Sequence, residues 1–145
     1  MKIVKDILKS KSSNSSILTI NPDETVLNAI KIMAEKNVGA LLVMENDRLV
    51  GIITERDYAR KVILAGKSSN NTQVREIMDQ NFLVVQPATT IEECMALMVE
   101  NSTRYLPVID NNLVTGMISM GNVVNSIITE QHFVINNLQQ YIMRG

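Results

Sequence analysis

Two short polar motifs contain the residue types that could bind a ligand in this chain. Thr54 and Asp57 follow one apolar segment and Ser119 and Asn122 follow another, so each hydroxyl precedes an acid or an amide by three positions. At the start of a helix this spacing is typical of a capping box, in which side chains bond to free backbone groups. The same free amides, together with the helix dipole, can instead bind a phosphate. A helix cap and a ligand site are therefore both open interpretations of each motif.

The two motifs belong to an internal repeat. The shift from Thr54 to Ser119 spans 65 positions, and it needs no insertion between Pro22 and Ile63. It aligns identical residues at these pairs of positions: Pro22 and Pro87, Thr25 and Thr90, Met33 and Met98, Glu35 and Glu100, Leu41 and Leu106, Val43 and Val108, Asn46 and Asn111, Gly51 and Gly116, Ile53 and Ile118. We interpret the chain as a duplication, with a first unit at residues 1–68 and a second unit at residues 69–145.

Each copy has the pattern of a strand, a helix, two strands and a second helix. In the first copy the strands are expected at Ile17–Ile20, Ala40–Met44 and Leu49–Ile53. One helix follows the predicted cap Thr25, and the helix that the motif opens is expected to run to about Ala65. These assignments rest on apolar residues at helical spacing and on short apolar runs bounded by turn residues.

The second copy repeats this order and then continues. Its strands are expected at Leu83–Val85, Tyr105–Ile109 and Val114–Ile118, and its last helix extends through Ile142 with an apolar face that must cover its own domain or another chain. The elements predict an α/β fold of the α+β type, in which two pseudo-symmetric strand-helix-strand-strand-helix units pack through their sheets. Such packing would create clefts where the units meet, and clefts of this kind are favoured ligand sites.

The composition argues against several classes of function. Of the 145 residues 46% are hydrophobic and 20% are charged, as in a globular protein, and a net charge of −1 provides no basic field for nucleic acid. No apolar run approaches the roughly 20 residues that span a membrane. With one cysteine (Cys94) and one histidine (His132), we expect no metal site, no activated nucleophile and no catalytic residue. The cytoplasm is the expected location.

Four stretches in register resemble the tandem cystathionine-β-synthase (CBS) domain pair, or Bateman module, of the stand-alone type. They lie at residues 37–43, 51–58, 103–108 and 116–119, and the resemblance covers residues 3 to about 130. It implies an α/β fold whose inter-unit clefts bind an adenine-containing ligand, such as AMP, ADP, ATP, S-adenosylmethionine or NAD. It also implies a homodimer that signals ligand occupancy to a partner protein, whose identity the residues do not specify.

Carried over to the first copy, the resemblance implies that Asp57 binds the ribose hydroxyls and that Thr54 binds phosphate, with Arg56 adding positive charge. The adenine slot would be lined by Thr19, Ile20, Val38, Gly39 and Ala40. Both polar roles suit the chemistry, because a carboxylate accepts two hydroxyl donors and a hydroxyl at a helix start can donate to an anion.

In the second copy the matching positions are Val84, Val85, Arg104, Tyr105, Pro107, Ser119 and Asn122. Arg104 is expected to reach phosphates, whereas the first copy has Gly39 at the equivalent position. Asn122 replaces the carboxylate and therefore weakens ribose recognition. We expect unequal sites with the Asp57 site the better one, and Ser119 stays open to interpretation as a helix cap alone.

Two functions compete. The first is a regulatory module that senses an adenine nucleotide or a related metabolite and requires no cofactor. The alternative is a structural dimerisation or interaction module with no physiological nucleotide ligand, which Asn122 and the extended last helix favour. Melting temperatures measured with and without nucleotides would distinguish the two functions.

Overall fold

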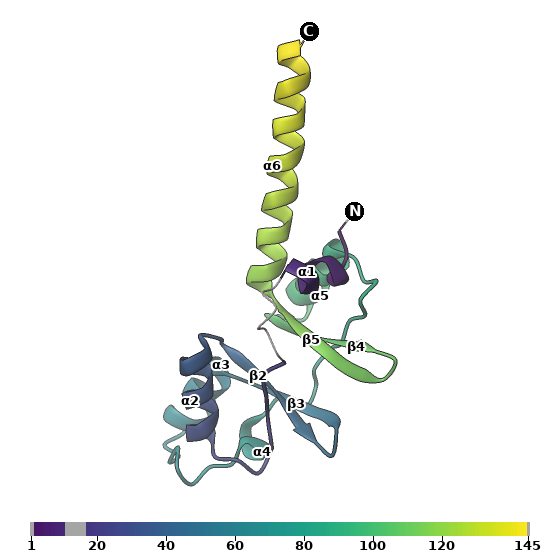
Figure 1. The fold of residues 1–145 in the computed structure, drawn as a ribbon. Helices are drawn as coiled ribbons and strands as arrows, with labels where there is room; N and C mark the ends of the chain where they lie inside the picture. Colours follow the sequence, from purple (N-terminus) through teal and green to yellow (C-terminus); the bar gives the residue numbers. More distant parts are fainter. Residues whose placement is uncertain (1, 11–16, 145) are drawn as a thin grey trace. The chain divides into compact units, whose positions relative to one another are not determined.

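The computed structural model describes residues 2–10 and 17–144, except for the side chains of Phe133 and of residues 141–144. The chain combines helices with small sheets, which confirms the predicted α+β fold. It forms two compact units: unit 2 comprises Ser16–Leu83, and unit 1 comprises Met1–Ser15 together with Val84–Gly145. Figure 1 shows the elements of each unit, coloured along the sequence.

Unit 2 contains a three-stranded sheet. Strand β1 (Thr19–Ile20) is parallel to β2 (Ala40–Glu45), and β2 is antiparallel to β3 (Arg48–Thr54). The turn between β2 and β3 places Asn46 and Asp47 at φ 52° and 63°. This left-handed pair is the conformation that a two-residue hairpin favours, and Asn and Asp adopt it more readily than most residues.

Helix α2 (Val26–Lys36) covers the core of unit 2. Its start is capped by Thr25, whose side chain accepts a hydrogen bond from the Asn28 amide at 3.1 Å, as the sequence predicted. The apolar side of α2 and the sheet supply most of one buried cluster. The cluster contains Ile20, Val26, Ala29, Met33, Leu41, Val43, Ile53, Val62, Val74, Ile77 and Met78.

The helix after β3 differs from its prediction. It begins as α3 (Glu55–Tyr58) but continues as a π-helix, η1 (Ala59–Ile63), rather than as an α-helix to Ala65. The Leu64 amide donates to the Ala59 carbonyl at 3.0 Å, five residues back, so each turn accommodates an extra residue. The helix ends at Ile63, two residues before the predicted end, and a turn follows in which Gly66 has φ 71°.

A helical turn that lies after the predicted repeat boundary at residue 68 completes unit 2. This turn, α4 (Val74–Ile77), bonds through its first amides to the turn before α2, with Val74 N–H donating to the Glu24 carbonyl at 2.8 Å. Directly after it, Asp79 and Ile52 exchange backbone hydrogen bonds of 2.8 and 3.0 Å. The segment that follows α4 therefore pairs with β3.

Unit 1 repeats this design but takes its lead-in turn, the short helix whose first amides bond to the turn before the longer helix, from another part of the chain. Strands β4 (Tyr105–Asp110) and β5 (Leu113–Ser119) form its hairpin, and helix α5 (Ile91–Glu100) packs against β4. Helix α1 (Val4–Ser10) takes the place of α4, because Val4 N–H donates to the Thr89 carbonyl at 2.8 Å. The strand expected at Leu83–Val85 is reduced to one bridge, in which Val85 pairs in parallel with Val108.

The compact units therefore do not coincide with the two repeats. The predicted sequence units divide at residue 68, but α1 bonds to residues 87 and 89 of the second repeat, and α4 bonds to residues 22 and 24 of the first. Each unit draws its lead-in turn from the other side of the repeat boundary. The physical reason is hydrogen bonding, because the first amides of each short helix need acceptors that the helix itself lacks.

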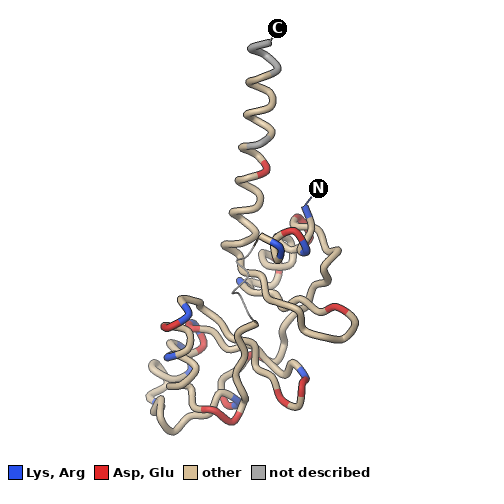
Figure 2. Tube along the Cα trace, in the orientation of Figure 1, with Lys and Arg blue, Asp and Glu red and all other residues tan. Residues whose placement is uncertain are grey.

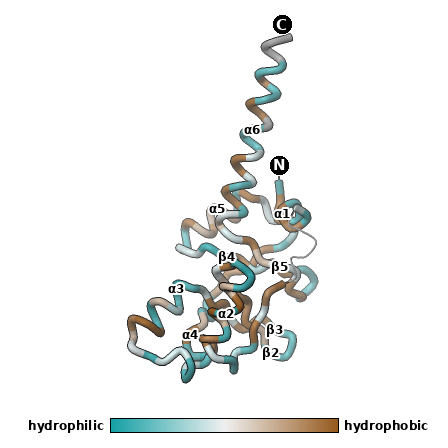
Figure 3. Tube along the Cα trace, turned by 60° about the vertical axis from the view of Figure 1, so that its left-hand side comes forward, coloured by the Kyte–Doolittle hydropathy of each residue, from teal (hydrophilic) through white to brown (hydrophobic). Residues whose placement is uncertain are grey.

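Helix α6 (Met120–Arg144) continues past the repeat. Its first turns pack against α5 and bury Val123 completely, but Val134, Ile135 and Leu138 are half-exposed. Figure 2 shows few charged residues along this helix, and Figure 3 shows apolar residues distributed among polar ones. Within residues 2–10 and 17–144, no helix has both the length and the apolar character needed to span a membrane.

Candidate functional site

The predicted residues of the first motif meet at one end of the unit 2 sheet. Ala40 begins β2 directly opposite Thr54, which ends β3, and the Glu55 amide donates to the Gly39 carbonyl at 3.0 Å. On the other side of β2, Thr19 pairs with Leu42. Because β1 runs parallel to β2, its start lies toward the same end of the sheet. The fold thus brings together three segments that sequence reasoning had grouped only by resemblance.

Thr54 and Asp57 form a reciprocal capping box, which confirms the cap interpretation. The Asp57 amide donates to Thr54 Oγ1 at 3.0 Å, and the Thr54 amide donates to Asp57 Oδ2 at 3.1 Å. The Thr54 hydroxyl also donates to Oδ2, at 3.0 Å. This proton is therefore committed to the carboxylate rather than directed at a ligand, so binding a phosphate would require the hydroxyl to rotate.

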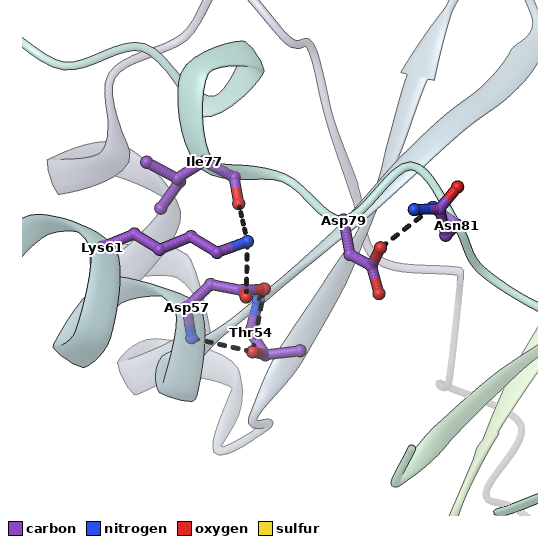
Figure 4. Close-up of polar contacts among 6 residues, drawn as sticks. All are labelled: Thr54, Asp57, Lys61, Ile77, Asp79 and Asn81. Atoms are coloured by element: carbon purple, nitrogen blue, oxygen red, sulfur yellow. Dashed lines mark hydrogen bonds and ion pairs between the residues drawn. The ribbon is translucent and has the colours of Figure 1, made fainter. Parts of the chain in front are cut away.

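The Asp57 side chain is only 16% exposed, and its carboxylate is already partly occupied (Figure 4). Oδ2 accepts two hydrogen bonds from Thr54, and Oδ1 lies 3.3 Å from Lys61 Nζ. A carboxylate offers about four acceptor positions, so about one stays open on Oδ1. Rotation of the Thr54 hydroxyl would free a second position, and two positions are what a pair of vicinal hydroxyls needs.

Lys61 is a residue of this site that sequence reasoning missed. It follows Asp57 by four positions in a helical stretch, which is the spacing at which opposite charges meet on a helix surface. Arg56, which was predicted to contribute charge, is exposed in α3, while Val38 and Gly39 are half-buried beside the start of β2. The acid–base spacing was the available signal for Lys61.

The second motif has the same cap but a different hydrogen-bond balance. The Ser119 amide donates to Asn122 Oδ1 at 2.9 Å, and the Asn122 amide donates to Ser119 Oγ at 3.1 Å. Within the described part of the chain, the Ser119 hydroxyl donates to no protein acceptor, unlike that of Thr54. An exposed Arg104 precedes β4, and its carbonyl accepts from the Met120 amide at 2.8 Å. The second motif therefore has a hydroxyl proton that is free to meet an anion.

The other predicted residues of the second copy surround this turn. Tyr105 lies opposite Ser119 and Pro107 opposite Met117 in the hairpin. The Val85 amide donates to the Pro107 carbonyl at 2.9 Å, whereas the Val84 side chain is 43% exposed. The structure thus gathers this set within unit 1, as it gathers the first set within unit 2.

Cys94 belongs to the core rather than to a site. It lies on the buried side of α5, and its burial, followed by the nearby charges of Glu93 and Glu92, raises the pKa of the thiol to about 11. The Cys94 side chain therefore packs as a small buried hydrophobe. In the described residues, no group of three or more His, Cys, Asp or Glu side chains is arranged to hold a metal ion.

Comparison with known proteins places two copies of one family model on this chain. The CBS domain model matches residues 4–63 and 74–129. The CBS domain-containing protein CBSX3, mitochondrial, of Arabidopsis thaliana is 41% identical over 98% of this chain and 72% of its own length. The solved structure of a protein with CBS domains from Burkholderia ambifaria MC40-6 is 48% identical, with a TM-score of 0.86 over 90% of this chain and 96% of its own.

A more distant structure contains ligands. The CBS domain pair of protein MJ0100, solved in complex with 5-methylthioadenosine and S-adenosyl-L-methionine, is 23% identical, with a TM-score of 0.76 over 90% of this chain and 98% of its own. At this identity the similarity establishes a shared fold alone.

Proposed function

Because this chain belongs to the CBS domain family, with a tandem pair of such domains, we propose that it is a regulatory module that binds an adenine nucleotide or a related adenosyl metabolite and signals its occupancy to a partner protein. The observation that carries the proposal is the geometry of Asp57. The Asp57 side chain, which is only 16% exposed, lies at the end of a sheet, where the Glu55 amide bonds to the Gly39 carbonyl. A carboxylate in that place has acceptors for a ligand but little access to bulk water.

Binding would proceed by an exchange of hydrogen bonds at the capping box. Rotation of the Thr54 hydroxyl toward a phosphate would remove one donor from Asp57 Oδ2 and supply one to the anion. The two ribose hydroxyls would then donate to the freed position on Oδ2 and to the open one on Oδ1. The amide bonds of the cap need not change, so the helix start would keep its structure while the ligand is bound.

The predicted site residues enter the proposal in two groups. Thr19, Ile20, Val38, Gly39 and Ala40 would hold the adenine ring of a ligand at Asp57, and Arg56 would lie near its phosphate. The second group, around Ser119 and Asn122, would form a weaker site for ribose, although its free hydroxyl suits an anion.

The second motif also supplies a control for the experiment. Asn122 makes the same cap bonds to Ser119 as Asp57 makes to Thr54 through its carboxylate, so Asp57→Asn should keep the helix cap while removing the charge and one acceptor. Melting temperatures would be measured with AMP, ADP, ATP, S-adenosylmethionine and NAD. A ligand at 100 times its Kd stabilises by about 2.7 kcal/mol, which corresponds to a rise of roughly 5–11 °C.

We expect such a rise for at least one ligand, a smaller rise for 2′-deoxy analogues, and loss of most of the rise in Asp57→Asn. The ligand-free melting temperature of Asp57→Asn should stay close to that of the wild type, because the cap is kept. The reciprocal variant Asn122→Asp should bind as well as the wild type or better. Flat curves for the wild type across the panel would refute the proposal.

Helix α6 favours a second function, as a structural interaction module. Val134, Ile135 and Leu138 are each at least half-exposed, which is unusual for three aliphatic side chains within five residues of one helix. If α6 is an interaction surface, ending the chain at Thr129 should lower the number of chains per particle, as measured by light scattering, without changing ligand-induced stabilisation. The homodimer and the cytoplasmic location stay predictions.

A further inference from the structure

Lys61 makes two contacts that join separate parts of unit 2 (Figure 4). Its ammonium lies 3.3 Å from Asp57 Oδ1, and it donates a hydrogen bond of 3.0 Å to the Ile77 carbonyl. The first contact is to the proposed ribose carboxylate, and the second is to the last residue of α4. One flexible side chain therefore connects the candidate site to a segment 16 residues further along the chain.

The Ile77 carbonyl needs such a donor. Carbonyls in the last turn of a helix have no partner within the helix. After Ile77 the chain leaves the helical conformation, since Met78 is extended at φ −60° and ψ 149°. Lys61 therefore supplies a donor that α4 does not supply, and a charged donor forms a stronger hydrogen bond than a neutral one.

The contacts of Lys61 close a ring through the sheet. From Ile77 the chain passes to Asp79, which pairs with Ile52 through backbone hydrogen bonds of 2.8 and 3.0 Å. Ile52 lies two residues before Thr54 on β3, and Thr54 bonds to Asp57. The Asp79 backbone is thus tied to the capping box by two routes, one through β3 and one through Lys61.

The chain beyond this ring leads out of the unit. The Asp79 side chain accepts a hydrogen bond from the Asn81 amide at 2.9 Å, and unit 2 ends at Leu83. We call residues 78–83 the exit segment, because they connect α4 and the candidate site to unit 1 along the chain. A change in the position of Lys61 would reach this exit segment through the Ile77 carbonyl.

From these contacts we infer that Lys61 is a positioning residue, which orients the Asp57 carboxylate for a ligand with vicinal hydroxyls and links ligand occupancy to the exit segment at residues 78–83. The inference rests on the proposed function and deepens it. Lys61 holds Oδ1 from one side while Thr54 holds Oδ2 from the other, so the carboxylate keeps one orientation. When a ligand fixes the carboxylate more firmly, Lys61 and the Ile77 carbonyl are held more firmly as well.

The first test is a mutant cycle on affinity, measured by calorimetry with whichever of AMP, ATP or S-adenosylmethionine stabilises the wild type best. Lys61→Met removes the ammonium but keeps a long side chain, and we expect a loss of about twofold to fivefold in affinity, the upper part of the range for a half-exposed ion pair. Lys61→Arg should recover part of this loss. In the Asp57→Asn background, Lys61→Met should have little further effect, because Lys61 acts through the carboxylate.

Arg60 provides the matched control. It is the neighbouring residue, exposed, with the same charge, and it has no side-chain hydrogen bond or ion pair among the described residues. Arg60→Met therefore changes the net charge equally without breaking the ring, and its affinity should equal that of the wild type. An equal loss in Arg60→Met would identify a general charge effect and overturn the role assigned to Lys61.

The second test follows the exit segment by amide hydrogen exchange. Ligand binding should slow exchange at Thr54, Asp57 and Asp79 in the wild type, and the slowing at Asp79 should be smaller in Lys61→Met, in which only the route through β3 remains. Equal slowing at Asp79 in both proteins would overturn the link. If the wild type binds but Lys61→Met binds equally well, the positioning role is wrong and the proposed function stands. A wild type that binds none of the ligands refutes both.

Discussion

Replacing Gly51 by alanine tests how closely the segment after α4 approaches β3. A Cβ atom at this position would lie 2.8 Å from Met78 Sδ, 2.9 Å from Met78 Cγ and 3.1 Å from the Asp79 carbonyl oxygen. The methionine can adapt, because its side chain is unbranched and flexible. The carbonyl has less freedom, because it accepts a hydrogen bond from the Ile52 amide at 3.0 Å.

Two opposing terms set the magnitude. Overpacking in a well-packed region typically costs about 1–3 kcal/mol. Against this, alanine restricts the unfolded chain and recovers about 0.4–1 kcal/mol where the backbone conformation suits it. We therefore expect Gly51→Ala to lower the free energy of unfolding by about 1–2 kcal/mol, with an unchanged dependence on urea concentration.

The repeat supplies the control, because Gly116 is the equivalent residue of the second copy. A Cβ there would meet only the side chain of Leu8, with its Cδ2 atom at 2.9 Å and no backbone atom among the nearest contacts. Leu8 can turn its terminal methyl groups, so Gly116→Ala should change the free energy of unfolding by at most about 0.5 kcal/mol. Urea unfolding, followed by circular dichroism and fluorescence of an added dye, would compare the two variants. Equal costs, or a neutral Gly51→Ala, would refute the argument that the Asp79 backbone limits this position.

Two further predictions concern other glycines and the buried thiol. Gly66→Ala should destabilise by about 1 kcal/mol because φ is 71°, although no atom lies within 4 Å of the added Cβ. Gly121→Ala, within α6 and with its nearest atom at 3.6 Å, should stabilise by about 0.5–1 kcal/mol. Thermal unfolding should therefore show shifts of opposite sign, and shifts of the same sign would contradict the reasoning. Burial raises the pKa of the Cys94 thiol to about 11, so this thiol keeps its proton in the folded state at a pH where the unfolded thiol ionises. The stability that it contributes is therefore fully present below the pKa of the unfolded thiol and is lost as pH rises toward 11. The difference in unfolding free energy between the wild type and Cys94→Ala should decline across that window, and a difference that is independent of pH would contradict the raised pKa.

Local sequence signals predicted the hairpins and the capping boxes well. Ala40–Glu45 and Arg48–Thr54 differ from the predicted strands by a residue at most at each end, because an apolar run, a polar Asn-Asp turn and a second apolar run specify the hairpin within one stretch of chain. The Thr54 and Asp57 cap was likewise predictable from its spacing.

The features that sequence reasoning missed depend on non-local contacts. The pairing of α1 with residue 89 joins segments that are 85 positions apart, and no periodicity reports such a contact. The π-helix at Ala59–Ile63 has the same apolar spacing as an ordinary helix over so few residues. The contact of Lys61 with Ile77 could not be predicted because the two residues are 16 positions apart, although the pairing of Lys61 with Asp57 follows the ordinary i, i+4 rule.

The origin of the two lead-in turns has a consequence for how the protein is made. During synthesis, α1 leaves the ribosome before its hydrogen-bond acceptors at residues 87 and 89, which are translated roughly 80 residues later. Residues 17–73 must likewise wait for α4 before the first sheet acquires its last packed element. A fragment that ends at residue 68 would keep α1 without its acceptors at residues 87 and 89 and would lose α4, so we expect neither half of the chain to form its compact unit alone.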